Sequence, residues 1–229
     1  MENLPLLTEQ WIKLLQEKKD RDALDFYCTN IIPNIIPKLK ENFIKNHNIQ
    51  PNYDGIISLL GFTPDTVILT YLFAKPKKLI VLHTKETERF LDDVVKYTSI
   101  PIGNFYHEVF IEDPSIDIYR ALEVSINRFD KDEKIAIELT GGKKTMGGAL
   151  AVAAGLLDID QLYIDYKEYM PSFRKPKPES TYIHLVTNPL RLSIDVFGNI
   201  DLERASMFFN EGKYDVSEEL FIQSSKKNE

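Results

Sequence analysis

The sequence has little cysteine and no excess of positive charge, and each shortage excludes a class of protein. Its 229 residues include a single cysteine, Cys28, so an internal disulfide is impossible and a cytoplasmic location is expected. The net charge of -7 argues against binding to long nucleic acid, because that affinity is the sum of many cation–phosphate contacts. A compact anion held by a local group of lysines is still compatible with this balance.

Long apolar runs and metal-ligand spacings are also missing. No run is long enough to span a membrane, and no signal peptide is recognisable. The histidines lie far apart along the chain, at His47, His83, His107 and His184. We therefore expect no membrane association, no metal and no cofactor.

From residue 53 onward, short apolar segments alternate with helical ones. Strands are predicted at about 56–60, 79–82, 106–111, 135–139 and 162–166, with a later antiparallel strand at 181–187. Thr63 and Pro64 are predicted to begin the first intervening helix, Thr84 to cap the second, and Asp113 with Pro114 to start the third. Such alternation forms right-handed parallel crossovers. The predicted fold class is therefore α/β, with a Rossmann-like, mostly parallel sheet and flanking helices.

Both ends of the chain are predicted to be helical. Residues 1–52 form an N-terminal helical extension, 53–190 the ligand-binding domain, and 191–229 a helical segment that contains a hairpin. Apolar residues of the hairpin have no partner in the remaining sequence. We expect this segment to lead to an effector domain that this chain lacks; the alternative is that it packs on this domain or on a second copy.

The most informative stretch is IAIELTGGKKTMGG, residues 135–148. A buried strand ends there, two glycines follow, and a helix opens beside two lysines. Free backbone N–H groups at a helix start, together with lysines, suit a phosphate. The alternative is an ordinary turn with solvated lysines, and the residues alone favour neither. The turn matches neither GxxxxGK[ST] nor GxGxxG, so ATP and NAD have no motif support.

In such sheets, ligands bind beyond the carboxyl ends of the strands where the strand order reverses. The turns after the first and fourth strands are therefore the predicted site. Glycines in the helix that follows, such as Gly147 and Gly148, predict a close approach by the sheet, a second subunit or a ligand. Glu138 and Asp165 are expected to have structural or surface roles, because spacing assigns no carboxylate pair. Tyr169 and Arg174 are candidates for a lid over the ligand, or for packing the loop on the sheet.

Two motifs resemble the ligand motifs of CRISPR-associated Rossmann fold (CARF) domains. They are LTGGKKTMGGAL after the fourth strand and GFTPDTVILTYLFAKPKKLIVLHTKET after the first. The tracts LYIDYKEYMPSFRKPKPES and FFNEGKYDVSEELF resemble a subgroup with a helical continuation, so the resemblance covers about residues 53–221. It implies a homodimer, or a higher homo-oligomer, that senses a cyclic oligoadenylate made by type III CRISPR complexes in antiviral defence. The ring, a tetra- or hexa-adenylate, would lie across the two-fold axis.

The resemblance also implies residue roles. The ligand-binding residues would be Gly61, Phe62, Thr63, Thr140, Gly141, Gly142, Lys143, Lys144, Thr145 and Met146. Binding would control a C-terminal effector allosterically, although no RxxxxH ribonuclease motif is present. The alternative is a ring nuclease that cleaves its ligand by metal-independent 2′-OH attack, with Lys144, Lys143 and Thr63 as candidate catalytic residues. A DNA-binding regulator is disfavoured, because one hairpin and an acidic tail supply no such module.

Overall fold

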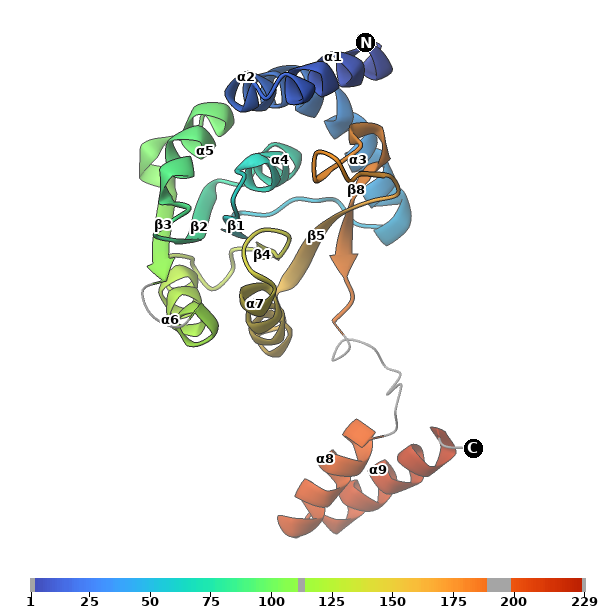
Figure 1. Ribbon diagram of the computed structural model, residues 1–229. Helices are drawn as coiled ribbons and strands as arrows, with labels where there is room; N and C mark the ends of the chain where they lie inside the picture. Colours follow the sequence, from blue (N-terminus) through green and yellow to red (C-terminus); the bar gives the residue numbers. More distant parts are fainter. Residues whose placement is uncertain (1–2, 111–113, 189–198, 228–229) are drawn as a thin grey trace. The chain divides into compact units, whose positions relative to one another are not determined.

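The computed structural model describes residues 3–110, 114–188 and 199–227 (Figure 1). The chain divides into two compact units, Met1–Val186 and Thr187–Glu229. Each is described by itself. The domain boundary predicted between residues 190 and 191 falls outside the described residues.

Unit 1 is built on a six-stranded sheet in the order β3-β2-β1-β4-β5-β8. The strands are β1 (Gly55–Leu59), β2 (Lys78–Thr84), β3 (Phe105–Phe110), β4 (Ile135–Glu138), β5 (Asp160–Tyr166) and β8 (Thr181–Val186). All neighbours pair in parallel except β5 and β8, which are antiparallel. The predicted α/β fold class is confirmed. The strand order reverses between β1 and β4, which brings the carboxyl ends of these two strands together.

Helices cover both faces of this sheet (Figure 1). On one face lie α4 (Asp65–Ala74) and α5 (Leu91–Thr98), and on the other lie α6 (Pro114–Ile126) and α7 (Lys144–Leu156). Successive side chains of a strand point to opposite faces. Accordingly, Ile56 of β1 lies in one apolar cluster and Ile57 in the other. The second cluster contains Met146 and Leu150 of α7, and this packing fixes the turn that precedes α7.

The N-terminal helices pack on the first of these clusters. They are α1 (Leu4–Gln16), α2 (Asp20–Phe26) and α3 (Ile32–His47), and a π-helical turn at Tyr27–Ile31 joins α2 to α3. The rings of Trp11 and Tyr27 lie 4.9 Å apart. The predicted N-terminal helical extension is therefore present, and its core is continuous with that of the sheet.

The predicted helix starts need small corrections. The helix α4 begins at Asp65 with Pro64 as its N-cap, so Thr63 stands one residue outside the cap. Thr84 belongs to β2 instead of capping a helix, because its hydroxyl faces Thr87 in a turn (Oγ1–Oγ1 3.4 Å) and α5 begins only after the 3₁₀ turn Glu88–Phe90. Residues 111 and 113, predicted to end a strand and start a helix, lie outside the described residues.

Unit 2 is the predicted helical hairpin, formed by α8 (Asn199–Asn210) and α9 (Tyr214–Lys227). Its two helices meet through small residues: the Ser217 hydroxyl donates a hydrogen bond to the Ala205 carbonyl oxygen at 2.7 Å. Large apolar side chains face outward, and Met207 and Phe209 are 62% and 56% exposed. Within the described parts of the chain, no helix has the length and apolar character needed to cross a membrane.

Candidate functional site

The two predicted turns contact each other through their glycines. A Cβ atom added to Gly141 would lie 1.9 Å from the Leu59 carbonyl oxygen, and one added to Gly61 would lie 3.0 Å from the Gly142 backbone nitrogen. Gly142 itself has φ +75°, a conformation that side-chain-bearing residues rarely adopt. Glycine is therefore required where the turn after β4 crosses the end of β1. The turns that carry the two motifs are therefore in direct backbone contact.

A buried carboxylate lies beneath this surface. Glu138, the last residue of β4, is fully buried and accepts hydrogen bonds from the Ser58 hydroxyl at 2.6 Å and from the Thr140 backbone N–H at 2.6 Å. Burial raises the pKa of Glu138, and the hydrogen bonds from Ser58 and Thr140 oppose this rise. The side chain ties β1 to the start of the glycine turn. Of the structural and surface roles predicted for Glu138, its burial and hydrogen bonds correspond to the structural one.

Two of the predicted ligand residues have their side chains engaged within the protein. The Thr140 hydroxyl accepts a hydrogen bond from the Ile164 N–H at 2.8 Å, which fixes the turn to β5. The Met146 side chain is fully buried, and its sulfur accepts the Lys143 N–H at 3.4 Å. These contacts of Thr140 and Met146 stabilise the turn between β4 and α7. Direct contact of either residue with a ligand stays a prediction.

The other predicted residues are accessible. Phe62 is 64% exposed, and Thr63, Lys143, Lys144 and Thr145 are also exposed. Within the part of the chain that the structure describes, neither Lys143 nor Lys144 forms an ion pair. Lys143 is the N-cap of α7, whose first backbone N–H groups have no intrahelical acceptor. Lys143 and Lys144 are therefore unpaired cations beside the positive end of the α7 dipole. This arrangement favours the binding of an anion.

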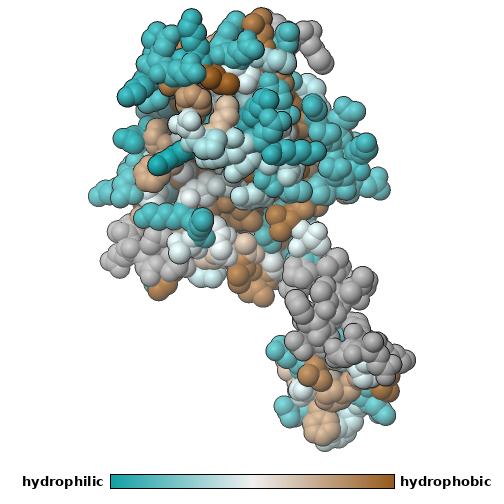
Figure 2. Space-filling model, turned by 45° about the vertical axis from the view of Figure 1, so that its right-hand side comes forward, coloured by the Kyte–Doolittle hydropathy of each residue, from teal (hydrophilic) through white to brown (hydrophobic). Residues whose placement is uncertain are grey.

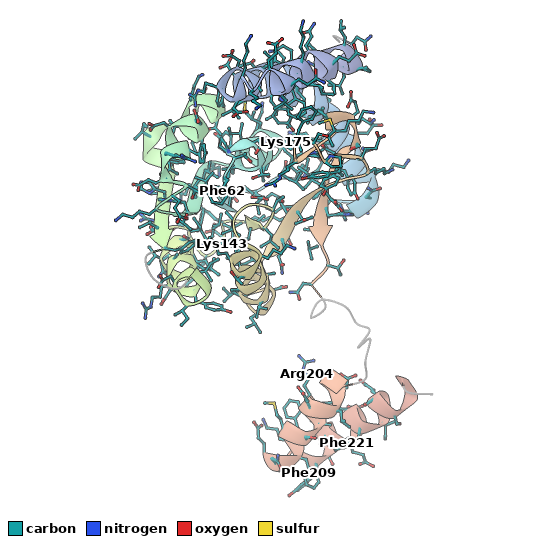
Figure 3. All side chains as sticks on the ribbon, in the orientation of Figure 1. Phe62, Lys143, Lys175, Arg204, Phe209 and Phe221 are labelled. Carbon is teal, nitrogen blue, oxygen red and sulfur yellow. The ribbon has the colours of Figure 1, made fainter. Side chains whose placement is uncertain are left out.

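A short hairpin closes over the first turn and carries a residue that the sequence reasoning missed. Its strands are β6 (Tyr169–Met170) and β7 (Lys175–Pro176). Lys175 forms an ion pair with Asp65, the first residue of α4, and both side chains are mostly buried. Burial raises the pKa of Asp65, but the Lys175 charge and hydrogen bonds from Lys175 and Thr63 outweigh it, so the pKa lies below its usual range. Figure 3 places Phe62, Lys143 and Lys175 in the same part of unit 1.

The two lid candidates sit on this hairpin. The ring of Tyr169 stacks on that of Tyr166 at 5.0 Å between centroids, and Tyr169 is 44% exposed. Arg174 adopts φ +52° in the turn before Lys175 and is exposed. Lys175 anchors one strand of the hairpin, and Tyr169 on the other strand stacks on Tyr166 at the end of β5. A lid role for Tyr169 and Arg174 remains a prediction.

The histidines form no metal centre in the described residues, where no group of three or more candidate ligands occurs. His83 and His107 do meet on neighbouring strands, with Nε2 and Nδ1 3.0 Å apart. Burial lowers the pKa of His83. Sequence spacing gave no sign of this pair, because β2 and β3 bring together residues 24 positions apart.

Comparison with known proteins supports the resemblance. No family model matches the chain. The chain is 25% identical over 220 residues to the CRISPR system endoribonuclease Csm6 of Thermus thermophilus, a match that covers 93% of this chain and 45% of that protein. The chain thus spans less than half the length of this curated relative.

A solved Csm6 structure confirms the fold. Csm6 of Enterococcus italicus, bound to cyclic hexa-2′-fluoro-hexa-dAMP, superposes with a TM-score of 0.50 at 14% identity, covering 76% of this chain and 49% of that one. Can2 of Sulfobacillus thermosulfidooxidans, in complex with cyclic tetra-adenylate, gives a TM-score of 0.45 at 13% identity, covering 69% and 49%. The CARF resemblance read from the two turns is confirmed by the Csm6 sequence match and by the shared fold.

Proposed function

We propose that the chain is the cyclic oligoadenylate sensor of a type III CRISPR antiviral system, acting in the cytoplasm as a homodimer. The observation that carries this proposal is the contact between the two glycine turns, which gathers Phe62, Thr63 and two unpaired lysines over the ends of β1 and β4. The Csm6 relative and the Csm6 neighbour solved with a cyclic hexa-adenylate analogue support the choice of ligand.

A cyclic ligand explains why one copy of the site would be incomplete. Each protomer offers one lysine turn, and a ring with repeated phosphates presents the same group to two symmetry-related turns. Gly148, one turn into α7, has open space where a Cβ would be: apart from its chain neighbours and the adjacent helix backbone, no described atom of the protomer lies within 4 Å. Its glycine is therefore not required by packing within the protomer. We infer that a glycine is needed at position 148 because the ring or a second copy of the chain approaches the helix there.

The exposed sides of α6 and α7 are the surface that we assign to the second copy. Val152 and Leu156 continue the face of α7 that starts at Gly148, and they are 59% and 73% exposed. Ile116 and Tyr119 of α6 are 56% and 47% exposed. Figure 2 shows hydrophobic side chains gathered on the lower part of unit 1, where Figure 1 places these helices. The apolar face begins at the lysine turn, so covering it with a second copy would also bring two such turns together.

The helical hairpin of unit 2 is proposed to pass the signal to an effector. A pair of short helices that buries small residues and exposes Met207 and Phe209 needs further apolar surface for its stability. The Csm6 relative is about twice as long as the region matched here, and its name assigns it endoribonuclease activity. We propose that ligand binding changes the angle between protomers and that this change reaches the effector allosterically through residues 190–221.

The alternative, a ring nuclease, rests on the same geometry. The candidate catalytic residues Thr63, Lys143 and Lys144 come from two turns whose backbones touch. Together they could orient a ribose 2′-OH and stabilise charge on the adjacent phosphate without a metal.

Incubation of the chain with cyclic tetra- and hexa-adenylate, followed by chromatography of the nucleotides, separates the alternatives. Tight binding with the ring intact supports a sensor. Linear products within minutes, lost in Lys144→Ala, support a ring nuclease. Failure to bind either ring would refute both.

A further inference from the structure

A cavity of about 640 Å³ lies beside the first turn, between the N-terminal helices and the sheet. Its walls come from α1, α2, the π-helical turn, the residues after β1, the start of α5 and the β6–β7 hairpin. Sites for small molecules typically have volumes of about 300–1,000 Å³. The cavity is large enough for one nucleobase and its sugar, and Phe62 and Thr63 of the predicted ligand turn form part of its wall.

Aromatic and aliphatic side chains form much of its lining. They are Trp11, Leu15, Leu24, Tyr27, Phe62 and Phe90. The π-helical turn holds Tyr27 against Trp11, with ring centroids 4.9 Å apart. Such a lining favours a flat ring, because aromatic side chains stack on every nucleobase.

The charged side chains that line the cavity have no net charge. Three carboxylates (Asp20, Asp65, Asp93) face three cations (Arg21, Arg89, Lys175). Arg21 pairs with Asp93 at 2.6 Å, and Lys175 pairs with Asp65. The third cation, Arg89, lies over the Phe90 ring at 4.8 Å, so a phosphate placed here would meet a lining with no net charge and two cations already paired. A neutral base is therefore the better occupant, whereas the unpaired lysines of the neighbouring turn suit its phosphate.

The cavity and the lysine turn are adjacent through the backbone. Phe62 and Thr63 line the cavity, and Gly61, the residue before them, packs against Gly142. A nucleotide whose phosphate lies on the lysine turn can therefore direct its base past Phe62. Asp20 stands exposed among the lining residues, where its carboxylate can accept a hydrogen bond from the exocyclic amino group of adenine.

We propose that this cavity binds an adenine base turned outward from the cyclic ligand, so that the N-terminal helices contribute base recognition to the sensor. This inference rests on the proposed function. It assigns the recognition of adenine to α2 and the π-helical turn, and the recognition of phosphate to the turn after β4. The two contributions are separable by substitution.

The only tryptophan of the chain reports on the cavity directly. Trp11 lines it and is 2% exposed, so its emission arises from this one place. Titration of the full chain with cyclic tetra- and hexa-adenylate is followed by Trp11 fluorescence and, in parallel, by calorimetry. The emission is expected to change with the same midpoint as the heat.

Two substitutions make the test specific. Leu24→Phe fills the cavity and is expected to weaken binding about tenfold, the loss of roughly one stacked base. Leu14→Phe, the same change at another partly buried leucine that lies outside this cavity, should leave affinity within about twofold. Asp20→Ala at an exposed position should reduce the preference for cyclic oligoadenylate over cyclic oligoinosinate, whose base lacks the amino group.

The outcomes separate this inference from the proposed function. If the ring binds while Trp11 emission stays constant and Leu24→Phe and Asp20→Ala bind as wild type, the cavity is not a base site and the sensor proposal stands. If neither ring binds to the wild type, both proposals fail. Should Leu24→Phe not fold, Trp11 emission and the Asp20→Ala base preference decide the question without it.

Discussion

Gly141 lies so close to Leu59 that a Cβ atom on the glycine would stand 1.9 Å from the leucine carbonyl oxygen. The obstacle is backbone, which cannot rotate away as a flexible side chain can. This contact locks the lysine turn onto the end of β1. The geometry of the proposed anion site is therefore set by the sheet.

The first prediction follows from this contact. Gly141→Ala should lower the free energy of unfolding by about 1–3 kcal/mol or more, because the two strand ends must separate to admit the methyl group. Gly103→Ala, outside the proposed site, is the control, since a Cβ there would meet no atom beyond its chain neighbours within 4 Å. Urea denaturation of both variants measures the difference. Equal stability of Gly141→Ala and wild type would show that the turns do not touch in solution.

The second prediction concerns the unpaired lysines. Lys143→Ala and Lys144→Ala should each weaken binding of a cyclic oligoadenylate by roughly 10- to 100-fold, the worth of a hydrogen bond to a charged group. Each should also reduce the slope of log affinity against log salt by about 0.7–0.9. Lys131→Ala, at an exposed lysine in the loop before β4, serves as control. Unchanged affinity in both test variants would mean that these lysines are only solvated surface residues.

The third prediction concerns the hairpin anchor. Lys175→Met should destabilise the fold by about 3–5 kcal/mol, because it leaves the buried Asp65 carboxylate unpaired. The double variant Asp65→Asn with Lys175→Met should recover most of this loss. If the double variant were no more stable than Lys175→Met, the ion pair would not be the reason for the loss.

The same pair has a defined pH dependence. Asp65 has a pKa below its ordinary value of 3.8 in the folded state, so its stabilisation is present above pH 3.8 and is lost as the pH falls through the lowered pKa. The advantage of wild type over the double variant should therefore shrink in acid. An advantage that stays constant down to the lowest pH at which the protein folds would contradict the lowered pKa.

The fourth prediction concerns Glu138. Its pKa is raised above 4.5 in the folded state, so the folded protein holds a proton that the unfolded chain releases, and stability falls as the pH rises through that window. Glu138→Gln removes this dependence. The free energy of unfolding of wild type minus that of the variant should decline from pH 4.5 upward. A difference that grows with pH would reverse the sign and refute the raised pKa.

Much of the fold could be predicted from the sequence because its signals are local. Apolar runs of strand length alternate with helix patterns, and the glycines at 61, 141 and 142 mark the places where backbone meets backbone. The strand order then puts the two turns together. The remaining features depend on contacts between distant segments: Lys175 meets Asp65 across 110 positions, and the cavity forms only where α1 and α2 pack beside the first turn. Local sequence patterns do not predict contacts between residues that lie far apart in the sequence.

The predicted site combines exposed side chains with side chains that are engaged within the protein. Met146 and Thr140 were grouped with the ligand residues because they stand in the motif, but motif membership does not distinguish a side chain that faces the ligand from one that supports the turn. Packing makes that distinction: Met146 points into the core beneath α7, and the Thr140 hydroxyl is bonded to β5. The exposed side chains of the predicted site are Phe62, Thr63, Lys143, Lys144 and Thr145.

The most direct test of the central claim is the stoichiometry of ligand binding. Calorimetric titration of the chain with cyclic tetra- and hexa-adenylate, combined with light scattering of the complex, counts rings and protomers in the same sample. The account predicts tight binding of one ring by two chains, lost when Lys143 and Lys144 are both replaced by alanine. Binding of one ring per chain, or no binding of either ring, would contradict it.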